Sequence, residues 1–413
     1  MATQGGIEAP KGTADWLPRQ VATRAAIIAE AAAIFERAGY EQIETPVFEA
    51  AELFKRGVGE ATDIVEKEMF TFEDLGGRHM TLRPEGTAAI CRAYVQHGMH
   101  KLPQPVRLWY AGPFFRYEAP QAGRYRQFSQ IGAEAIGTES PLADAESISM
   151  LDTLLRELGV PGVELGLGSL GSPETRATYR IELQEYLRAH AGELSEEVKR
   201  RIETNPLRAF DAKDPGTNAV MEEAPKLLDR LSESDAAHLA EVEKLLGALG
   251  VDYRIDPTLV RGLDYYSQTV FAFTCDRLGA QSEIGGGGRY DGLVAELGGP
   301  PTPAVGWAAG LERIAIALEE EPAAPERDVF VAAVEPAQRV RAAALVDELR
   351  RKGLSAELDL AGRSVKGQLK QANRINARHT VILDEDGTAQ LKEMTSGEQR
   401  QVATADVLDE LLK

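Results

Sequence analysis

Cysteine is almost absent from this sequence. Its two cysteines, Cys91 and Cys275, lie far apart in the 413 residues and show no CxxC spacing. This pattern argues against a disulfide framework and against a cysteine-based zinc site, and it favours a reducing, cytoplasmic setting. We expect no protein metal site.

Long apolar runs are also lacking. The residues that follow Met1 do not resemble a signal peptide, and no later stretch approaches the length of a membrane span. We therefore expect a soluble protein without a membrane segment. With 43% hydrophobic and 27% charged residues, the chain can fill sizeable cores, and its length predicts two or three domains.

Positive charge is scarce, since 46 basic residues stand against 65 acidic ones, a net charge of −19. Such an excess argues against nucleic-acid binding by the chain as a whole. From Arg327 to Lys413, however, 14 basic and 14 acidic residues balance. All of the acidic excess therefore lies in residues 1–326, which indicates two electrostatically different modules.

The order of predicted elements divides the chain further. A loop at 9–18 precedes a helix whose apolar residues recur at helical spacing. β-rich runs are expected at 68–72, 80–83, 106–117 and 126–136, and those without an intervening helix are expected to form antiparallel hairpins. A mainly helical segment at 172–250 follows, opened by Ser172 as an N-cap, and β-like runs resume from 253 to 273.

The C-terminal part has a different pattern. A charged, proline-bearing linker at 319–325 leads into strand, helix, strand, helix and strand at 329–334, 337–352, 355–360, 364–376 and 380–383. This alternation predicts a βαβαβ unit. On its second helix Arg363, Lys366, Lys370 and Arg374 are expected to form one basic stripe, either a solvated face or an RNA contact.

The hairpin at 107–137 carries the most informative chemical pattern. Side chains alternate faces along a strand, so Phe114, Arg116 and Glu118 share one face of its first strand. Phe128, Gln130, Gly132 and Glu134 share a face of the second, where Gly132 is expected to leave room for a ligand ring. Such a surface suits a small charged ligand with a flat ring, although a solvated sheet face with paired charges is the alternative.

Two further segments pair charge with a turn. After Pro84, Glu85 and Thr87 stand at a helix start, where they either cap the helix or bind an ammonium group. Arg261 beside Gly262 offers a fork of donors to a phosphate, unless the segment is an ordinary strand start with a surface arginine.

Two glycine-containing segments complete the set. The four glycines at 285–288 indicate a close approach of backbone to a ligand or another backbone, or a flexible loop; they match neither a Walker loop nor GxGxxG. Glycines also precede a helix at 311–318, whose Arg313 lies off the apolar stripe. Arg313 is therefore free to face a ligand or solvent.

Together, these motifs resemble the class II aminoacyl-tRNA synthetases. Residues 44–49, with Pro46, resemble the first class II motif, residues 115–118 with 123–128 the second, and residues 310–313 the third. The segments 261–266 and 287–292 narrow the resemblance to histidyl-tRNA synthetases. The likeness extends from about Lys11 to the C-terminus.

The resemblance implies an α+β catalytic domain, with an antiparallel sheet flanked by helices, in two parts at 1–171 and 251–321. A helical insertion domain at 172–250 would interrupt it, and an α/β anticodon-binding domain would occupy 327–413. The implied activity is histidine–tRNA ligation by a homodimer, with Pro46 at the dimer interface. The implied substrates are histidine, ATP with Mg²⁺, and tRNA(His).

The resemblance also assigns roles to residues. Histidine would be bound by Glu85, Gly86, Thr87, Gln130, Glu134, Tyr265, Tyr266 and Tyr290. ATP would be bound by Arg116, Glu118, Arg124, Phe128, Arg261 and Arg313, of which Arg116 and Arg261 are the expected catalytic residues. The tRNA would meet Arg124 and the terminal residues Arg363, Lys366, Lys370 and Arg374.

Three rival readings differ in testable ways. An inactive paralogue, such as the regulatory subunit of histidine biosynthesis, tends to lose the arginines and the terminal domain, both of which are present here. A class II ligase for another amino acid is disfavoured by the segments at 261 and 287. A purely RNA-binding scaffold protein is disfavoured because it would have no need for the polar face of the hairpin.

Overall fold

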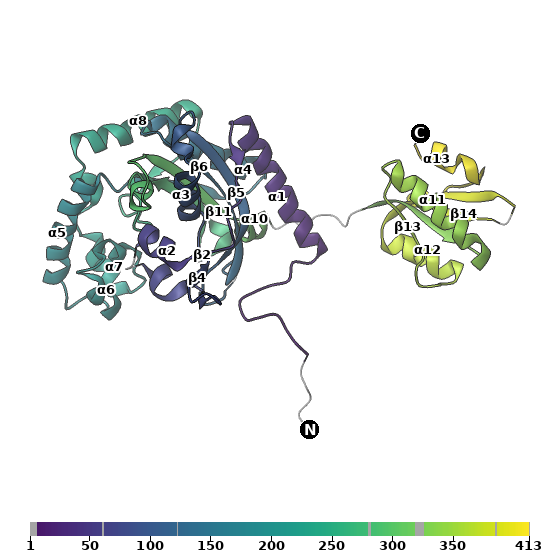
Figure 1. Ribbon diagram of the computed structural model, residues 1–413, viewed down its shortest axis with the longest axis horizontal. Coiled ribbons are helices and arrows are strands. Elements are labelled where there is room, and N and C mark those ends of the chain that lie inside the picture. Colours follow the sequence, from purple (N-terminus) through teal and green to yellow (C-terminus); the bar gives the residue numbers. More distant parts are fainter. Residues whose placement is uncertain are drawn as a thin grey trace, which may run out of the picture. The chain divides into compact units, whose positions relative to one another are not determined.

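The computed structural model describes residues 6–59, 62–121, 123–279, 282–318, 326–384 and 386–412. The chain forms two compact units, residues 1–320 and 321–413 (Figure 1). The predicted linker at 319–325 lies outside the described residues. Each unit is therefore described by itself.

An eight-stranded sheet forms the centre of the first unit. Its strand order is β1-β5-β6-β11-β10-β9-β7-β8. Neighbours from β5 to β7 are antiparallel, as predicted, whereas the edge strands β1 and β8 run parallel to β5 and β7. In that order the strands span Glu41–Gln42, Val106–Phe115, Gln127–Ile136, Ala304–Gly310, Glu283–Arg289, Ser267–Cys275, Val163–Ser169 and Arg254–Ile255.

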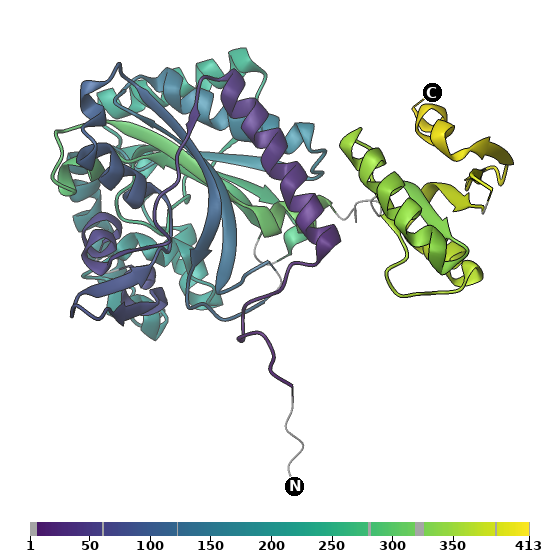
Figure 2. The ribbon, with the colours of Figure 1, turned by 45° about the vertical axis from the view of Figure 1, so that its right-hand side comes forward.

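Helices cover both faces of this sheet because side chains alternate along its strands. Trp109 and Ile131 belong to the core under α1 (Pro18–Arg37), α4 (Pro141–Glu157), α8 (Glu233–Leu249) and α10 (Leu311–Leu318). Leu108 and Tyr110 belong to a second core with α2 (Ala51–Val58), α3 (Thr87–Gln96) and α9 (Leu293–Glu296). Figure 2 shows α1 lying along one face of the sheet.

The helical segment has the predicted start. Ser172 caps α5 (Pro173–Ala189) by accepting from the Thr175 amide, and α6 (Glu196–Arg201), a 3₁₀ helix (Pro206–Asp211) and α7 (Pro215–Glu222) follow (Figure 1). The fourth helix, α8, packs its buried Leu239, Val242 and Leu246 into the core of the large sheet. Leu249, at the end of this helix, is half exposed.

A three-stranded sheet, ordered β2-β4-β3, carries the first class II motif. Its strands are Phe48–Ala50, His79–Leu82 and Thr71–Glu73. The strand predicted at 68–72 was placed too early, because Ile64–Glu68 forms a π-helical turn first. Pro46, Val47 and Phe48 are exposed beside this sheet.

The second unit contains the predicted βαβαβ unit and more. Strands β12 (Arg327–Ala333), β13 (Ala356–Leu358) and β14 (Ala377–Leu383) are parallel, with α11 (Arg339–Arg351) and α12 (Val365–Arg374) between them. The antiparallel strands β15 (Thr388–Glu393) and β16 (Gln399–Ala403) and the helix α13 (Val407–Leu411) were not predicted. The sheet order is β13-β12-β14-β15-β16.

Candidate active site

A cavity of about 770 Å³ opens on the sheet face that carries Tyr110. The hairpin β5–β6, strands β10 and β11, the loop before β9 and the helical segment all contribute to its wall. Every residue predicted to bind histidine or ATP lines it: Glu85, Gly86, Thr87, Arg116, Glu118, Arg124, Phe128, Gln130, Arg261, Tyr265, Tyr266, Tyr290 and Arg313, with the single exception of Glu134.

The register of the hairpin confirms the predicted polar face. Phe114 on β5 pairs with Phe128 on β6, and Leu108 on β5 pairs with Glu134 on β6. Gln130 lies between Phe128 and Glu134 on β6, and all three side chains share one face of the hairpin. The Gln130 side-chain oxygen is buried and has no hydrogen-bond partner among the described residues. A buried acceptor without a partner is costly unless a ligand completes it, so this oxygen suits a donor such as an ammonium group.

The glycines of this face have a different use from the one predicted. Gly132 was expected to leave room for a ligand ring, but the Tyr110 ring lies against it and against Gly86, within 3 Å of where a Cβ would sit. A side chain at Gly306 would collide with the Glu134 carboxylate. These glycines thus make room for protein side chains that shape the cavity floor.

Glu134 lies directly below this floor and is 1% exposed. Its carboxylate accepts hydrogen bonds from the hydroxyls of Thr87 (2.8 Å) and Tyr290 (2.6 Å). An arginine partner, the alternative role for this glutamate, is not found among the described residues. Burial, reinforced by the charge of Glu85, raises the pKa of Glu134 to about 8, although both hydroxyls oppose the shift.

Glu85 has the capping role that its position predicted. Its carboxylate accepts from the backbone amides of Thr87 (2.7 Å) and Ala88 (3.0 Å), the first residues of α3. Burial raises the pKa of Glu85 above its ordinary value. The same carboxylate also faces the cavity, so capping and ligand binding are compatible here.

Three tyrosines gather beside Glu134. Tyr265 lies 4.7 Å from Tyr266 and 5.7 Å from Tyr290, measured between ring centroids. Burial raises the pKa of Tyr290 well above its ordinary value, so its hydroxyl stays a donor to Glu134. A flat ring that enters here meets aromatic walls and a buried acceptor.

The four glycines at 285–288 lie in β10, in the middle of the sheet, and not in a flexible loop. A Cβ on Gly287 or Gly288 would collide with a backbone carbonyl of a neighbouring strand. Of the predicted alternatives, close approach of another backbone is therefore confirmed.

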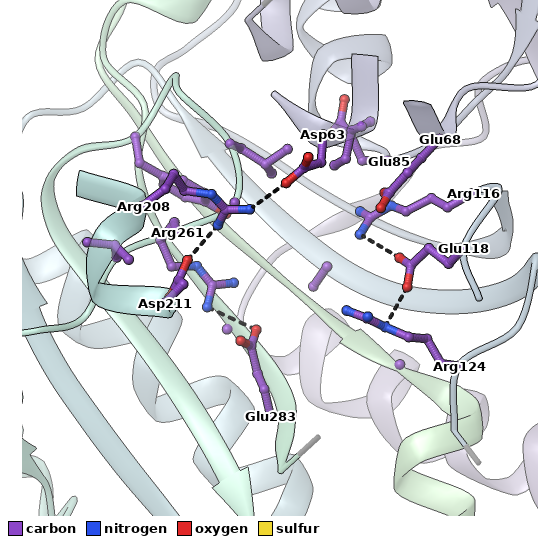
Figure 3. Close-up of a pocket in the computed structure, with 18 of the residues that line it drawn as sticks. Asp63, Glu68, Glu85, Arg116, Glu118, Arg124, Arg208, Asp211, Arg261 and Glu283 are labelled. Carbon is purple, nitrogen blue, oxygen red and sulfur yellow. Dashed lines mark hydrogen bonds and ion pairs between the residues drawn. The ribbon is translucent and has the colours of Figure 1, made fainter. Parts of the chain in front are cut away.

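One side of the cavity carries the residues predicted for ATP. Arg116 donates from Nε to the Pro84 carbonyl (2.9 Å) and lies 5.3 Å from the centre of the Phe128 ring. Glu118 pairs with Arg124 and lies 4.0 Å from Arg116 (Figure 3). Two arginines, Arg116 and Arg124, thus face the cavity together with the Phe128 ring, and the Glu118 carboxylate lies between the two arginines.

Glu283 joins two arginines that are distant in sequence. Its carboxylate lies 2.9 Å from Arg261 Nη1 (Figure 3). Its backbone carbonyl accepts a hydrogen bond from Arg313 Nη1 at 2.5 Å. Burial lowers the pKa of Arg261, but the charge and hydrogen bond of Glu283, together with the nearby Tyr266 and Tyr265, raise it by more, so Arg261 stays a cation. The Nε of Arg261 is buried and unpartnered within the described chain.

Several cavity residues were missed from the sequence: Glu283, and the ion-pair cluster Asp63, Arg201, Arg208 and Asp211. They come from four separate segments, and their local patterns are those of ordinary surface charges. No local signal could have found them.

In the terminal unit, Lys366, Lys370 and Arg374 are exposed on α12, as predicted, while Gln368 and Ala372 are buried. Arg363 was wrongly placed on that helix: it precedes the Ser364 N-cap and pairs with Asp359 at 2.6 Å. The described residues include no helix that could cross a membrane and no cluster of three or more potential metal ligands.

Comparison with known families covers both units. A family model described as histidyl-tRNA synthetase matches residues 12–314, and one described as an anticodon binding domain matches residues 328–413.

Full-length relatives agree with the family models. A histidine–tRNA ligase from Thermosynechococcus vestitus is 46% identical over 411 residues, 98% of this chain and 96% of the relative. One from Rubrobacter xylanophilus is 48% identical over 407 residues, 95% of this chain and 96% of the relative. The crystal structure of apo S. aureus histidyl-tRNA synthetase matches with a TM-score of 0.83 and 34% identity, covering 99% of this chain and 100% of that one.

Proposed function

The chain belongs to the histidyl-tRNA synthetase family, and from this premise we propose that it joins histidine to tRNA(His) at the expense of ATP. One observation carries the proposal: the cavity that Tyr265, Tyr266 and Tyr290 line also carries the arginines Arg116, Arg261 and Arg313, and Tyr290 is hydrogen-bonded to the buried acceptor Glu134. The tyrosines and the buried acceptor suit an imidazole, and the arginines suit phosphates.

Histidine is proposed to lie over the hairpin face. Glu134 accepts from the imidazole, and Tyr265, Tyr266 and Tyr290 surround the ring. Glu85, Thr87, Gln130 and the backbone at Gly86 meet the α-amino group. The unpartnered Gln130 oxygen and the Glu85 carboxylate support this, because an ammonium group needs acceptors.

The first chemical step needs no general base. An α-carboxylate has a pKa of about 3.5 and is already ionised at neutral pH. It attacks the α-phosphorus of ATP, which gives histidyl-adenylate and releases pyrophosphate. Arg116 and Arg261 align the reacting groups and offset the charge that develops on phosphate.

ATP is proposed to occupy the side of the cavity that carries Arg116, Glu118, Arg124, Phe128 and Arg313, with adenine near Phe128 and Glu118 and the phosphates near the arginines. A magnesium ion would arrive with ATP, held mainly by its phosphates. The carboxylates of Glu68 and Glu118 line this side and are of the oxygen type that magnesium prefers.

In the second step a terminal ribose hydroxyl of the tRNA attacks the adenylate carbonyl and releases AMP. Arg124 is proposed to meet the acceptor end, and Arg363, Lys366, Lys370 and Arg374 the RNA at the terminal unit. The exposed Pro46, Val47 and Phe48 support a homodimer contact at the three-stranded sheet. Two free, buried cysteines support a reducing cytoplasm as the site of action.

Amino-acid-dependent exchange between ATP and pyrophosphate tests the proposed activity. Exchange with histidine alone among the amino acids is expected. Exchange with a different amino acid would indicate another class II ligase, and no exchange with any of them would indicate an inactive paralogue or a scaffold.

Ending the chain after Leu318 should separate the two steps. The first unit has its own cores and contains the whole cavity, so histidine-dependent exchange is expected to persist. Charging of tRNA should weaken by at least roughly tenfold, because the basic contacts on α12 are lost. A truncated, folded protein that charged tRNA as well as the full chain would remove the terminal unit from RNA binding.

A further inference from the structure

The helical segment contributes an ion-pair cluster to the cavity that the proposed function does not use. Asp63 accepts from two arginines at once: its Oδ1 lies 2.6 Å from Arg201 Nη2, and its Oδ2 lies 3.2 Å from Arg208 Nη2. The three side chains are each about one-quarter exposed. Both arginines are more than 130 residues from Asp63 in sequence, so the pairs exist only in the folded chain.

Each arginine also forms a second ion pair with an acidic residue of its own helix. Arg201 Nη1 lies 3.3 Å from Glu197, one turn earlier in α6, and Arg208 Nη1 lies 2.6 Å from Asp211 in the same 3₁₀ helix. The two ends of each guanidinium therefore have different partners. A guanidinium offers five donors in a planar fork, so one end can change its acceptor while the other stays fixed.

This cluster borders the reaction centre on the side away from the proposed ATP site. Arg208 Nη1 lies 3.8 Å from the position that a Cβ on Gly262 would take, next to Arg261. Figure 3 shows Arg208 between Asp63 and Asp211, across the cavity from Arg116, Glu118 and Arg124. None of the residues proposed to bind histidine or ATP belongs to this cluster, so this part of the cavity wall is available to the substrate of the second step.

We propose that Asp63 is a placeholder, and that Arg201 and Arg208 exchange its carboxylate for backbone phosphates of the tRNA 3′ end in the transfer step. The inference rests on the proposed function. A phosphodiester carries a single negative charge, as the Asp63 carboxylate does, and likewise offers two oxygens, one for each arginine, so the exchange conserves the local pairing. Glu197 and Asp211 keep the arginines in place while Asp63 is released.

The proposal predicts opposite effects for the two halves of the cluster. Asp63→Asn removes a charged competitor, so the dissociation constant of a tRNA(His) transcript should fall by about three- to tenfold. Arg201→Gln with Arg208→Gln should raise it by roughly tenfold or more. In the double variant the slope of log affinity against log salt should also become shallower by about 0.7 for each lost phosphate contact.

Arg188 and Glu203 provide matched controls. They form an exposed pair at 2.7 Å on the same helical segment, outside the cavity, so Arg188→Gln and Glu203→Gln should leave tRNA binding unchanged. Melting curves check folding. If the double variant does not fold, Arg208→Lys should still weaken tRNA binding, because lysine keeps the positive charge but lacks the planar donors of the guanidinium.

A shift in the same direction for Asp63→Asn and the arginine variants, or no shift in either, would show that the cluster only braces the helical segment, and the proposal would be wrong. This result is distinct from failure of the proposed function, which would appear as a wild-type protein without histidine-dependent exchange. Direct tRNA binding needs no catalysis and is measured in either case.

Discussion

Replacing Arg261 with alanine is expected to slow histidine-dependent pyrophosphate exchange by roughly 10²- to 10³-fold, a loss of about 3–4 kcal/mol of transition-state stabilisation. The reason is its position: a mostly buried cation, held by Glu283, whose Nε has no partner among the described residues. Such a group is already oriented before ATP binds and needs little reorganisation during the reaction.

The protein should stay folded. Glu283, the partner that Arg261→Ala leaves behind, is about half exposed, so water replaces the lost contact. Arg254→Ala is the matched control, because Arg254 is an exposed arginine paired with Asp256 on the strand before this loop. Exchange close to the wild-type rate in Arg261→Ala would refute its assignment to the α-phosphate, whatever the control shows.

Replacing Glu134 with glutamine is expected to weaken histidine binding by about 10- to 100-fold, as for a hydrogen bond to a charged group worth about 1.5–3 kcal/mol. The neutral amide is a poorer acceptor for an imidazole N–H than a carboxylate. ATP affinity should change little, because Glu134 lies six residues further along β6 than Phe128, which is proposed to meet the adenine. Separate titrations of the two ligands measure this.

The affinity for histidine should also depend on pH. Because burial raises the pKa of Glu134 to about 8, the neutral carboxyl predominates at pH 7 in the empty cavity. The fraction ionised rises with pH, and with it the population of the better acceptor, so the dissociation constant should fall roughly fivefold between pH 7 and pH 8. In the glutamine variant this dependence should disappear.

Glu164, exposed on β7, serves as the control for Glu134→Gln, since its replacement by glutamine should affect neither ligand. A melting curve of Glu134→Gln distinguishes a role of Glu134 in binding histidine from a role in stabilising the fold. If Glu134 only braced the fold, the melting temperature would drop and both ligands would bind less well together. Unchanged histidine affinity in a folded variant would remove Glu134 from recognition.

Local patterns in the sequence predicted much of the fold. Period-two alternation identified the hairpin β5–β6 and the shared face of Gln130 and Glu134, because the pleat of a strand enforces that period. The glycine run was harder, since a strand without side chains has no hydrophobic pattern to read. The strands β15 and β16 were missed for a similar reason: they carry mixed polar residues, and only the pairing of β15 with β14 and of β16 with β15 defines them.

The sequence by itself determined the family motifs, the two modules and thirteen of the residues that line the cavity, because each of these belongs to a motif of neighbours within a few positions of the chain. Only the tertiary structure brought Asp63 to Arg201 and Arg208, set Tyr110 over Gly132, and placed Glu283 between Arg261 and Arg313. These contacts join segments that pack against each other only after the sheet has formed. Their energies depend on burial and distance in the folded chain, which no local spacing encodes.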